Sequence, residues 1–348
     1  MKLLIRATNW VGDAIIALPA VRAVRKRLAD AEITILARPY VADLYREQGV
    51  CNELIQYDWT GEHAGWSGRK RLVSELRGRR FDAAVLLQNA FDAAWLAWRA
   101  GIPERIGYAR DGRSWLLTKA VPVPRTGEIP SHEVFYYLEM LRRIGWLDEL
   151  PRDENVVLAV PETRRRRGAE LLLEAGARPH ARRIALGAGA SFGAARCWPA
   201  ERFAEAANRL AAEADADVVL IGTAGEAAVN GAIAAGLRRP AIDLTGKTAI
   251  AELPGVLSQC HLFIGNDSGV MHVAAAVGLP VVGVFGPTDP LGTAPMTSRR
   301  AIVQDKPYCS PCFLRRCPTD HRCMTRITPE MVEAAAKPWL VQVAERPA

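Results

Sequence analysis

The amino-acid sequence predicts an α/β protein made of two domains, each with a doubly wound parallel sheet. Its 348 residues are about twice the usual length of one domain. Short aliphatic runs alternate with longer amphipathic stretches along the whole chain, which is the pattern of parallel strands joined by helices. A new strand–loop–helix series begins at Ile184, so the second half reads as a second sheet of the same class.

Short aliphatic segments mark the expected strands, at 3–7, 33–37, 83–88, 156–159, 184–187, 217–221, 262–265 and 281–285. The main amphipathic segments, expected as helices, lie at 13–28, 164–175, 200–213, 271–277 and 329–343. Prolines and an arginine run between Leu150 and Pro179 indicate the link between the domains. We place the boundary there, with one domain at 1–165 and the other at 166–348, and we expect the last helix to pack back on the first domain.

Composition and charge exclude several classes of protein. Residues 1–150 carry 22 basic and 18 acidic side chains and the remainder carries 23 and 20, so neither half is a basic nucleic-acid-binding domain. The net charge of +7 favours anionic small molecules or an anionic membrane surface. No apolar run is long enough to span a bilayer. Arg6 and Asp13 interrupt the first apolar run, which therefore predicts a strand and a helix rather than a signal peptide. We accordingly expect a cytoplasmic protein.

Ligands of doubly wound sheets bind at the carboxyl ends of the strands, so the loops that follow strands are the candidate sites. The first loop, Thr8–Gly12, leads to Asp13 at the expected start of a helix, whose dipole favours an ionised carboxylate. An ionised Asp13 could accept a proton from a sugar hydroxyl, or it could simply cap the helix. Trp10 in this loop is expected to pack against the protein rather than to contact a ligand.

The second loop is rich in glycine from Gly187 to Gly193, which permits close approach of the backbone to a phosphate. Its glycine spacing is one residue too long for a dinucleotide fingerprint, and the next helix is expected only at Pro199. Arg196 either adds a permanent charge to this site or is an exposed residue on an ordinary turn. The third loop, Leu244–Thr248, lacks the first glycine of a P-loop, so we expect it to line a base or ribose instead.

The fourth loop is the most informative. A strand ends at Asp267 and a helix opens near Ser268, so the backbone N–H groups of Ser268 and Gly269 can face a diphosphate. Asp267 could hold sugar hydroxyls, and His272 lies one helical turn further on. The alternatives are that Asp267 or Ser268 caps the helix and that His272 packs in the core. The loop Gly286–Pro290 follows the next strand and is expected to form the neighbouring wall.

Together these motifs resemble glycosyltransferase family 9, the ADP-heptose:lipopolysaccharide heptosyltransferases, and most of all its heptosyltransferase II branch. The resemblance covers nearly the whole chain and rests on Asn9–Asp13, Trp198-Pro199, Leu244–Thr248, Gly265–Gly269 with His272, Gly286–Pro290, and the tail Cys309–Met324. It implies a GT-B fold, with two Rossmann-like domains facing a central cleft. The implied reaction is an inverting, metal-independent transfer of heptose from ADP-L-glycero-D-manno-heptose to the lipopolysaccharide inner core, at the second heptose.

The resemblance also implies roles by position. Asp13 matches the general base that deprotonates the acceptor hydroxyl, and Asp267 matches the residue that holds the donor heptose. The other implied donor contacts are Arg196, Glu226, Thr248, Ser268, Gly269 and His272. The family usually has Lys where this chain has Arg196, which keeps the charge but changes its reach and geometry. The implied partners are ADP-heptose and a lipid-anchored inner-core acceptor bound by the first domain, with peripheral contact at the cytoplasmic face of the inner membrane. No nucleic acid and no required cofactor are implied.

Two further clusters carry open alternatives. A basic stretch could contact phosphates of the acceptor or form a solvated helix face, and its central residues are Arg69, Lys70 and Arg71. Four cysteines near the end could hold structural zinc or remain reduced thiols, and they are Cys309, Cys312, Cys317 and Cys323.

Of three rival functions, the sequence argues against the first and leaves the other two open. A nicotinamide dehydrogenase would need a true glycine fingerprint followed by an acidic residue at the next strand end, and the sequence has none. A nucleotide-sugar epimerase on a GT-B scaffold would act on a UDP-sugar without an acceptor. A non-catalytic sugar-nucleotide-binding protein would be favoured by an Asp13 side chain that points away from the ligand.

Overall fold

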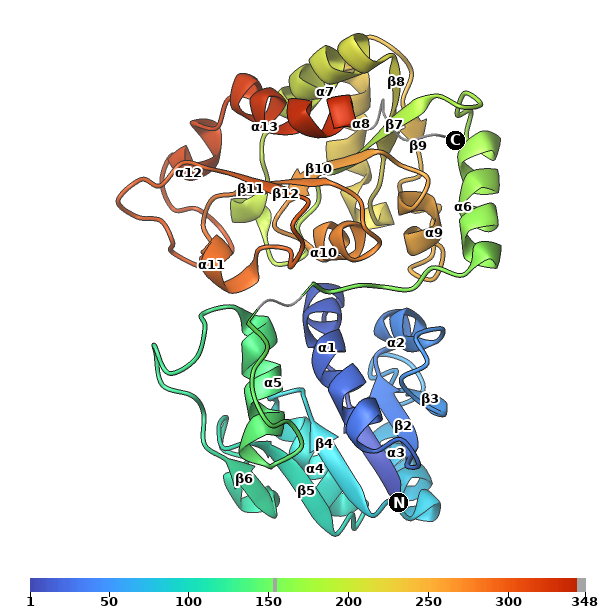
Figure 1. The fold of residues 1–348 in the computed structure, drawn as a ribbon, viewed down its shortest axis with the longest axis vertical. Helices are drawn as coiled ribbons and strands as arrows, with labels where there is room; N and C mark the ends of the chain where they lie inside the picture. Colours follow the sequence, from blue (N-terminus) through green and yellow to red (C-terminus); the bar gives the residue numbers. More distant parts are fainter. Residues whose placement is uncertain (153–154, 343–348) are drawn as a thin grey trace. The chain divides into compact units, whose positions relative to one another are not determined.

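The computed structural model describes residues 1–152 and 155–342. The chain forms two compact units, Met1–Glu154 and Asn155–Ala348, each built on one six-stranded parallel sheet (Figure 1). The expected boundary at 165/166 falls inside helix α6 (Glu162–Glu174), which packs against α9 (Leu253–Leu257) of the second unit. A Cβ on Gly168 would lie 2.2 Å from the carbonyl carbon of Gly255, so this close helix contact requires glycine and fixes α6 in the second unit.

The first unit has the strand order β3-β2-β1-β4-β5-β6, with every pair parallel. Its strands are β1 (Lys2–Arg6), β2 (Glu32–Ala37), β3 (Glu53–Gln56), β4 (Ala83–Leu86), β5 (Glu104–Tyr108) and β6 (Lys119–Val121). Its helices are α1 (Val11–Arg27), α2 (Pro39–Tyr45), α3 (Gly65–Arg79), α4 (Phe91–Arg99) and α5 (Glu133–Arg143), with a short 3-10 turn η1 (Ser114–Leu116). The chain progresses outward in both directions from β1 and β4, so the switch point lies between these two strands.

Helices cover both faces of this sheet, as right-handed crossovers require. α1 contacts α2 and α5 on one face, and Figure 1 draws α1 and α5 side by side in front of the strands. α3 and α4 pack together on the other face, where Leu72 and Ala94 are buried in one cluster with Leu4 and Leu86 of the strands. The outer surface of α3 and α4 therefore faces away from the sheet.

The second unit has the order β12-β11-β10-β7-β8-β9, again entirely parallel. Its strands are β7 (Arg182–Gly187), β8 (Ala216–Leu220), β9 (Ile242–Asp243), β10 (Leu262–Asn266), β11 (Val281–Phe285) and β12 (Arg300–Gln304). Besides α6 and α9, its helices are α7 (Ala200–Ala214), α8 (Ala227–Gly236), α10 (Gly269–Ala276), α11 (Pro290–Thr293), α12 (Arg322–Thr325) and α13 (Pro329–Gln342), with 3-10 turns η2 (Ala194–Arg196) and η3 (Ala224–Glu226). The prediction of two doubly wound parallel-sheet domains is confirmed.

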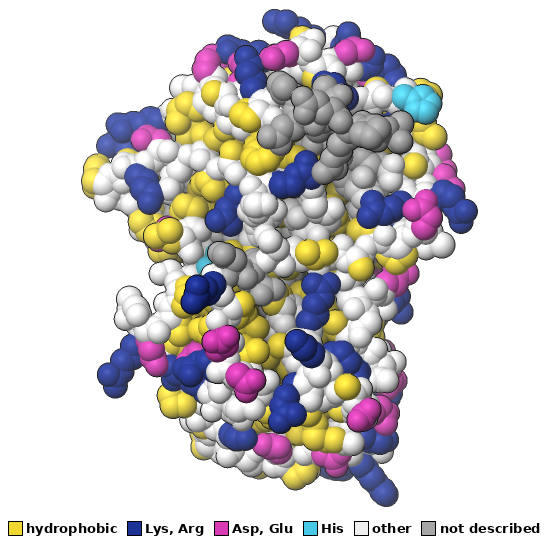
Figure 2. All heavy atoms as spheres, in the orientation of Figure 1, with side chains coloured by type: hydrophobic (Ala, Val, Ile, Leu, Met, Phe, Trp, Pro, Cys, Tyr) yellow, Lys and Arg dark blue, Asp and Glu magenta, His cyan; other side chains and the backbone are white. Residues whose placement is uncertain are grey.

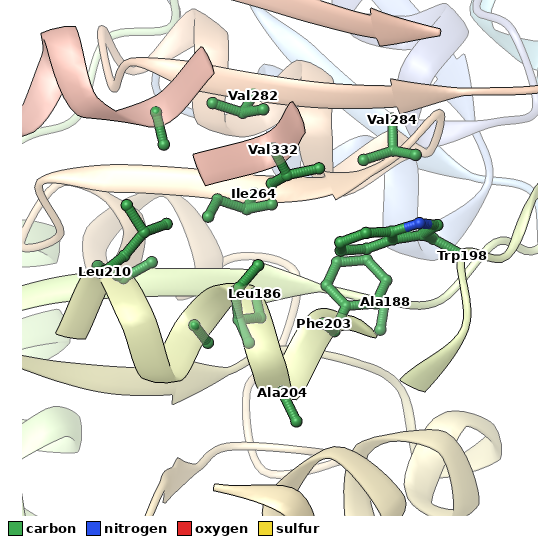
Figure 3. Close-up of a cluster of buried hydrophobic side chains, with 14 of the residues drawn as sticks. Leu186, Ala188, Trp198, Phe203, Ala204, Leu210, Ile264, Val282, Val284 and Val332 are labelled. Carbon is green, nitrogen blue, oxygen red and sulfur yellow. The ribbon is translucent and has the colours of Figure 1, made fainter. Parts of the chain in front are cut away.

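The core of the second unit is centred on Trp198, which is 1% exposed. Its ring packs edge-on against Phe203 of α7 with 4.9 Å between centroids (Figure 3), and its indole N–H donates to the Ile327 carbonyl at 3.0 Å. Val332 and Ala336 of α13 are buried in the same cluster. The buried side of α13 therefore belongs to the core of the second unit. The expectation that the last helix also packs on the first domain stays a prediction, and residues 343–348 lie outside the described part.

The expected strand at 156–159 is wrong. Its N–H groups at Val156 and Leu158 donate to the carbonyls of Met296 and Ala276, which belong to a loop and a helix end. The segment is thus held at two points, and within the described part of the chain no strand lies beside it to form a ladder.

The surface shows no concentration of one charge on the face drawn in Figure 2, where lysine and arginine are dispersed over both units among acidic and hydrophobic side chains. Among the described residues, no helix is long and apolar enough to cross a membrane.

Candidate active site

The predicted loops of the second unit meet at one edge of its sheet. The parallel neighbours β7, β10 and β11 end at Gly187, Asn266 and Phe285, so the loops after them share the carboxyl edge on both sides of the switch point. α10 begins at Gly269 with Ser268 as its N-cap, as expected from the sequence.

An ion pair joins two of these loops. A guanidinium nitrogen of Arg196 lies 2.9 Å from Asp267 Oδ2, and the Thr288 hydroxyl donates to the same oxygen at 2.8 Å. The Arg196 guanidinium also lies over the Phe192 ring, 4.2 Å from its centroid. Only 19% of the Arg196 side chain is exposed, so the alternative of an exposed arginine on an ordinary turn is wrong.

The Asp267 carboxyl is 4% exposed and its burial raises its pKa above the ordinary value. The charge of Arg196 and the hydrogen bond from Thr288 act in the opposite direction and partly offset this rise. A buried carboxylate that needs two partners to remain charged is typical of a functional site. Its lone pairs that face neither partner can accept hydrogen bonds from sugar hydroxyls.

Asn266 fixes the relative positions of these loops. Its side-chain oxygen accepts from the Trp198 backbone N–H at 3.0 Å, and its side-chain N–H donates to the Ala188 carbonyl at 2.6 Å. Asn266 is fully buried, so both bonds are shielded from water. The role of this residue was not predicted, although a polar residue that ends an apolar strand is a recognisable signal.

Three predicted donor-binding residues carry a buried polar atom that has no hydrogen-bond partner among the described residues. These atoms are Ser268 Oγ, Thr248 Oγ1 and Arg196 Nε. Unpaired buried polar atoms are unfavourable and uncommon, so their presence at the end of one sheet indicates a surface shaped for a polar ligand. The first N–H groups of α10 lie at the same edge and have no partner within the helix, which suits a phosphate.

Glu226 and His272 are held by the protein itself. Glu226 accepts hydrogen bonds from the Thr223 N–H at 2.6 Å and the Thr223 hydroxyl at 3.1 Å, forming a capping box on η3. It also lies against the glycine-rich loop, since a Cβ on Gly189 would be 1.6 Å from its Oε1. His272 is 5% exposed within α10, which agrees with the alternative that it packs in the core.

In the first unit, Asp13 is the third residue of α1 and is half-buried. Burial raises the pKa of Tyr45 and Tyr137, and the negative charge of Asp13 raises both further, so its carboxylate lies close to these two phenols. Trp10 occupies the N-cap of α1 without a side-chain capping bond. It is 53% exposed, so the expectation that it packs against the protein is wrong.

A pair of arginines beside this loop was not predicted. Arg6 and Arg38 both donate to Asn9 Oδ1, at 2.7 and 3.2 Å, and neither forms an ion pair with another described residue. Arg6 is 2% exposed, and its burial, with the charge of Arg38, lowers its pKa to about 10. In the sequence, this site could have been predicted from Arg6, a charged residue that ends the first apolar run. Two cations without an ion pair of their own, next to the α1 N-terminus, favour an anionic ligand there.

The three central residues of the basic stretch on α3 have different surroundings. Arg69 lies 3.5 Å from Asp92, which accepts from the Tyr57 hydroxyl at 3.0 Å, and the Tyr57 ring lies below the Arg6 and Arg38 guanidinium groups. Arg69 therefore connects to the arginine pair. By contrast, Lys70 lies over the Trp66 ring and Arg71 donates to the Glu62 carbonyl, so both are on the exposed face of the helix.

The four cysteines of the tail are free thiols that range from exposed (Cys309) to buried (Cys323). Across residues 1–152 and 155–342, no three His, Cys, Asp or Glu side chains are grouped to hold a metal ion. Zinc binding by Cys309, Cys312, Cys317 and Cys323 therefore stays one of the two open alternatives. The segment packs on the site loops. The Cys312 N–H donates to the Pro287 carbonyl at 3.0 Å, and His321 Nε2 bonds the Ala195 carbonyl at 2.7 Å.

The sequence and the structure were compared with those of known proteins, and both comparisons identify a protein family. The sequence model of glycosyltransferase family 9 (heptosyltransferase) matches residues 69–322, more than half of the chain. The chain belongs to glycosyltransferase family 9. This family-9 chain is 28% identical over 313 residues to lipopolysaccharide heptosyltransferase 2 of Salmonella typhimurium, covering 87% of this chain and 88% of that protein. It is 26% identical over 342 residues to lipooligosaccharide heptosyltransferase 2 of Campylobacter jejuni, covering 97% and 98%.

Solved structures agree with this assignment. The ADP-heptose lipopolysaccharide heptosyltransferase II of E. coli superposes with a TM-score of 0.83 at 26% identity, covering 99% of this chain and 100% of that one. A family-9 glycosyltransferase from Veillonella parvula has the same fold, with a TM-score of 0.86 at 22% identity and coverage of 98% and 97%. The expected GT-B class of two Rossmann-like domains and the expected glycosyltransferase activity are confirmed.

Proposed function

We propose that this glycosyltransferase moves heptose from ADP-heptose to the lipopolysaccharide inner core, at the position of the second heptose, with inversion and without a metal ion. The likeness to heptosyltransferase 2 proteins, which extends over 87% of the chain, supports the acceptor and the sugar. The observation that carries the donor assignment is the buried Asp267, held by Arg196 and Thr288 at the α10 N-terminus.

The second domain binds the donor in this proposal. Asp267 accepts hydrogen bonds from heptose hydroxyls, while Ser268 Oγ and the first N–H groups of α10 bond the diphosphate. Thr248 Oγ1 and Glu226, in the loops after β9 and β8, contact the adenosine. Gly269 starts α10 and allows the phosphate to approach the backbone, and His272 supports the helix from inside.

The first domain binds the acceptor. Asp13 acts as the general base that takes the proton of the attacking hydroxyl, a contribution of about 10²–10⁴-fold in rate. The acceptor oxygen attacks the anomeric carbon from the face opposite to ADP, so the bond to ADP breaks as the new glycosidic bond forms. Arg38 and Arg69 bind anionic groups of the inner core beside Asp13, and the buried Arg6 adds its positive charge to theirs.

ADP leaves with additional negative charge, which must be stabilised for the reaction to proceed. The α10 N-terminus and the permanent charge of Arg196 provide that stabilisation from fixed groups. A fixed cation and helix dipole at the leaving group make a bound metal ion unnecessary in this proposal. A chelator should therefore leave turnover unchanged.

The test is release of ADP from ADP-heptose, measured with and without an inner-core acceptor that carries one heptose. The proposal predicts fast release only with the acceptor, and a product whose new linkage has the anomeric configuration opposite to that of the donor. An acceptor without heptose should be a poorer substrate than the monoheptosylated one.

The same assay separates the rival functions. Interconversion of a UDP-sugar without any acceptor would assign an epimerase. Tight ADP-heptose binding with no ADP release under any condition would assign a non-catalytic binding protein. Retention of the anomeric configuration would refute direct displacement with Asp13 as base.

A further inference from the structure

An exposed aromatic face lies on the outer surface of the α3–α4 layer. Phe91, Trp95 and Trp98 are spaced four and three residues apart, so they form one stripe along α4. Phe91 and Trp98 are 43% and 41% exposed. Ala94 and Leu96 of the same helix are buried against the sheet, and Trp95 is partly buried against the same cluster. Phe91 and Trp98 are therefore the exposed ends of the stripe, and Trp95 is its partly buried centre.

Two more tryptophans extend this stripe on both sides. Trp66 of α3 lies 5.6 Å from Trp95, and Trp115 of η1 lies 6.1 Å from Trp98 and 6.3 Å from Phe91, measured between ring centroids. Trp66 and Trp115 are 58% and 67% exposed. Four of the nine tryptophans of the chain therefore lie in one connected face, a concentration that marks an interaction surface rather than scattered exposed residues.

Cations frame the aromatic face. Lys70 Nζ lies 5.6 Å from the Trp66 ring centroid and Arg99 Cζ lies 5.7 Å from that of Trp98. α3 and α4 carry six basic and two acidic side chains, and both acids are already paired, Glu75 with Arg79 and Asp92 with Arg69. The remaining cations form no ion pair with another described residue, and they are Lys70, Arg71, Arg77 and Arg99.

From this combination we infer that the aromatic face docks on the interface of an anionic lipid bilayer. Tryptophan prefers the headgroup level, where its ring is buried and its N–H stays wet, and unpaired Lys and Arg bind lipid phosphates. A second copy of the chain fits less well, because a symmetric contact would bring the unpaired cations of both copies together. Docking would bring the active site to an acceptor anchored in that bilayer. This role of the aromatic face rests on the proposed function.

The test is co-sedimentation of the full chain with vesicles, without ADP-heptose or acceptor. Vesicles of phosphatidylglycerol and phosphatidylethanolamine should bind the protein, vesicles of phosphatidylcholine should bind it far more weakly, and high salt should release it. Replacing Lys70 and Arg99 by Gln should weaken binding about 30-fold. The double variant Trp66→Ser, Trp115→Ser should weaken it about tenfold or more. Leu173→Ser, at an apolar side chain of α6 that is 50% exposed and lies outside the face, should not.

Three results would overturn the inference: equal binding to neutral and anionic vesicles, equal binding by the face variants and wild type, or concentration-dependent self-association that the tryptophan variants abolish. Circular dichroism and transfer to a short acceptor without lipid show that each variant is folded. Because transfer to that acceptor needs no bilayer, a failed vesicle experiment would leave the proposed reaction standing, and a failed transfer assay would leave the docking standing.

Discussion

Replacing Arg196 by Ala removes the side chain that connects the glycine-rich loop to Asp267. The pair is 2.9 Å apart and Asp267 is 4% exposed, so the variant leaves a buried carboxylate without its cation. Breaking such a pair costs about 3–5 kcal/mol. Since burial already raises the pKa of Asp267, the carboxyl can take up a proton and limit the loss to the lower end, about 3 kcal/mol. In a domain of this size that corresponds to a fall in Tm of about 6–12 °C.

The effect on catalysis should be larger than the effect on binding. Removing one charged donor to a leaving group typically lowers kcat by about 10²–10³-fold. Arg196→Lys keeps the charge but loses the forked donor, so its kcat should lie between those of Ala and wild type. The assay is ADP release with the monoheptosylated acceptor, together with differential scanning calorimetry.

The matched control is Arg209→Ala. Arg209 is also an ion-paired arginine of the second domain, but it lies on α7 with Glu205, Glu330 and Glu333 and is 37% exposed. Its loss should lower stability by at most about 1 kcal/mol and leave kcat unchanged. If Arg196→Ala lost stability but kept a kcat within a few-fold of the control, Arg196 would be structural and the leaving-group assignment would be refuted.

Three other predictions concern the same edge of the sheet. Asn266→Ala leaves the Trp198 N–H and the Ala188 carbonyl unpaired, so the free energy of unfolding in urea should fall by about 2–5 kcal/mol; a loss below 1 kcal/mol would contradict the role given to Asn266. Gly193→Ala places a Cβ 2.3 Å from the Arg315 carbonyl oxygen, and should raise KM for ADP-heptose and lower Tm, with Gly231→Ala, which has open space around its Cβ, as the control. Because burial raises the pKa of Asp267 above 3.8, the folded state keeps the carboxyl proton to a higher pH than the unfolded chain, and the free energy of unfolding should fall as pH rises above 3.8. The wild type should therefore lose stability relative to Asp267→Asn as pH rises. Urea-unfolding free energies of the two proteins that change equally with pH would refute the raised pKa.

The fold class was predictable because its signals are local and repeated. Buried parallel strands such as Leu262–Asn266 and Val281–Phe285 are continuous apolar runs, which the sequence displays directly. Strands that the prediction missed lie away from the sheet centres and mix charged with apolar residues, as in Glu104–Tyr108 and Arg300–Gln304. The opposite error at 156–159 arose because an apolar run does not reveal whether a partner strand is available.

The donor loops were predictable for a similar reason. A strand followed directly by Asp267, Ser268 and Gly269 places polar groups at a helix start whatever the rest of the chain does. The positioning roles of Asn266 and Thr288 were not predicted, because they depend on contacts with residues distant in sequence. The cysteine spacing likewise fixed no distances between the sulfurs, since a loop of that length can fold in many ways.

Asp13→Asn keeps the shape of the side chain and removes its charge, so it isolates the proposed general base. Calorimetric titration should give an affinity for ADP-heptose within about twofold of wild type, because the donor loops are untouched. Single-turnover transfer to the monoheptosylated acceptor should then be slower by about 10²–10⁴-fold. Transfer at nearly the wild-type rate would contradict the account, since the hydroxyl would be losing its proton to some other group.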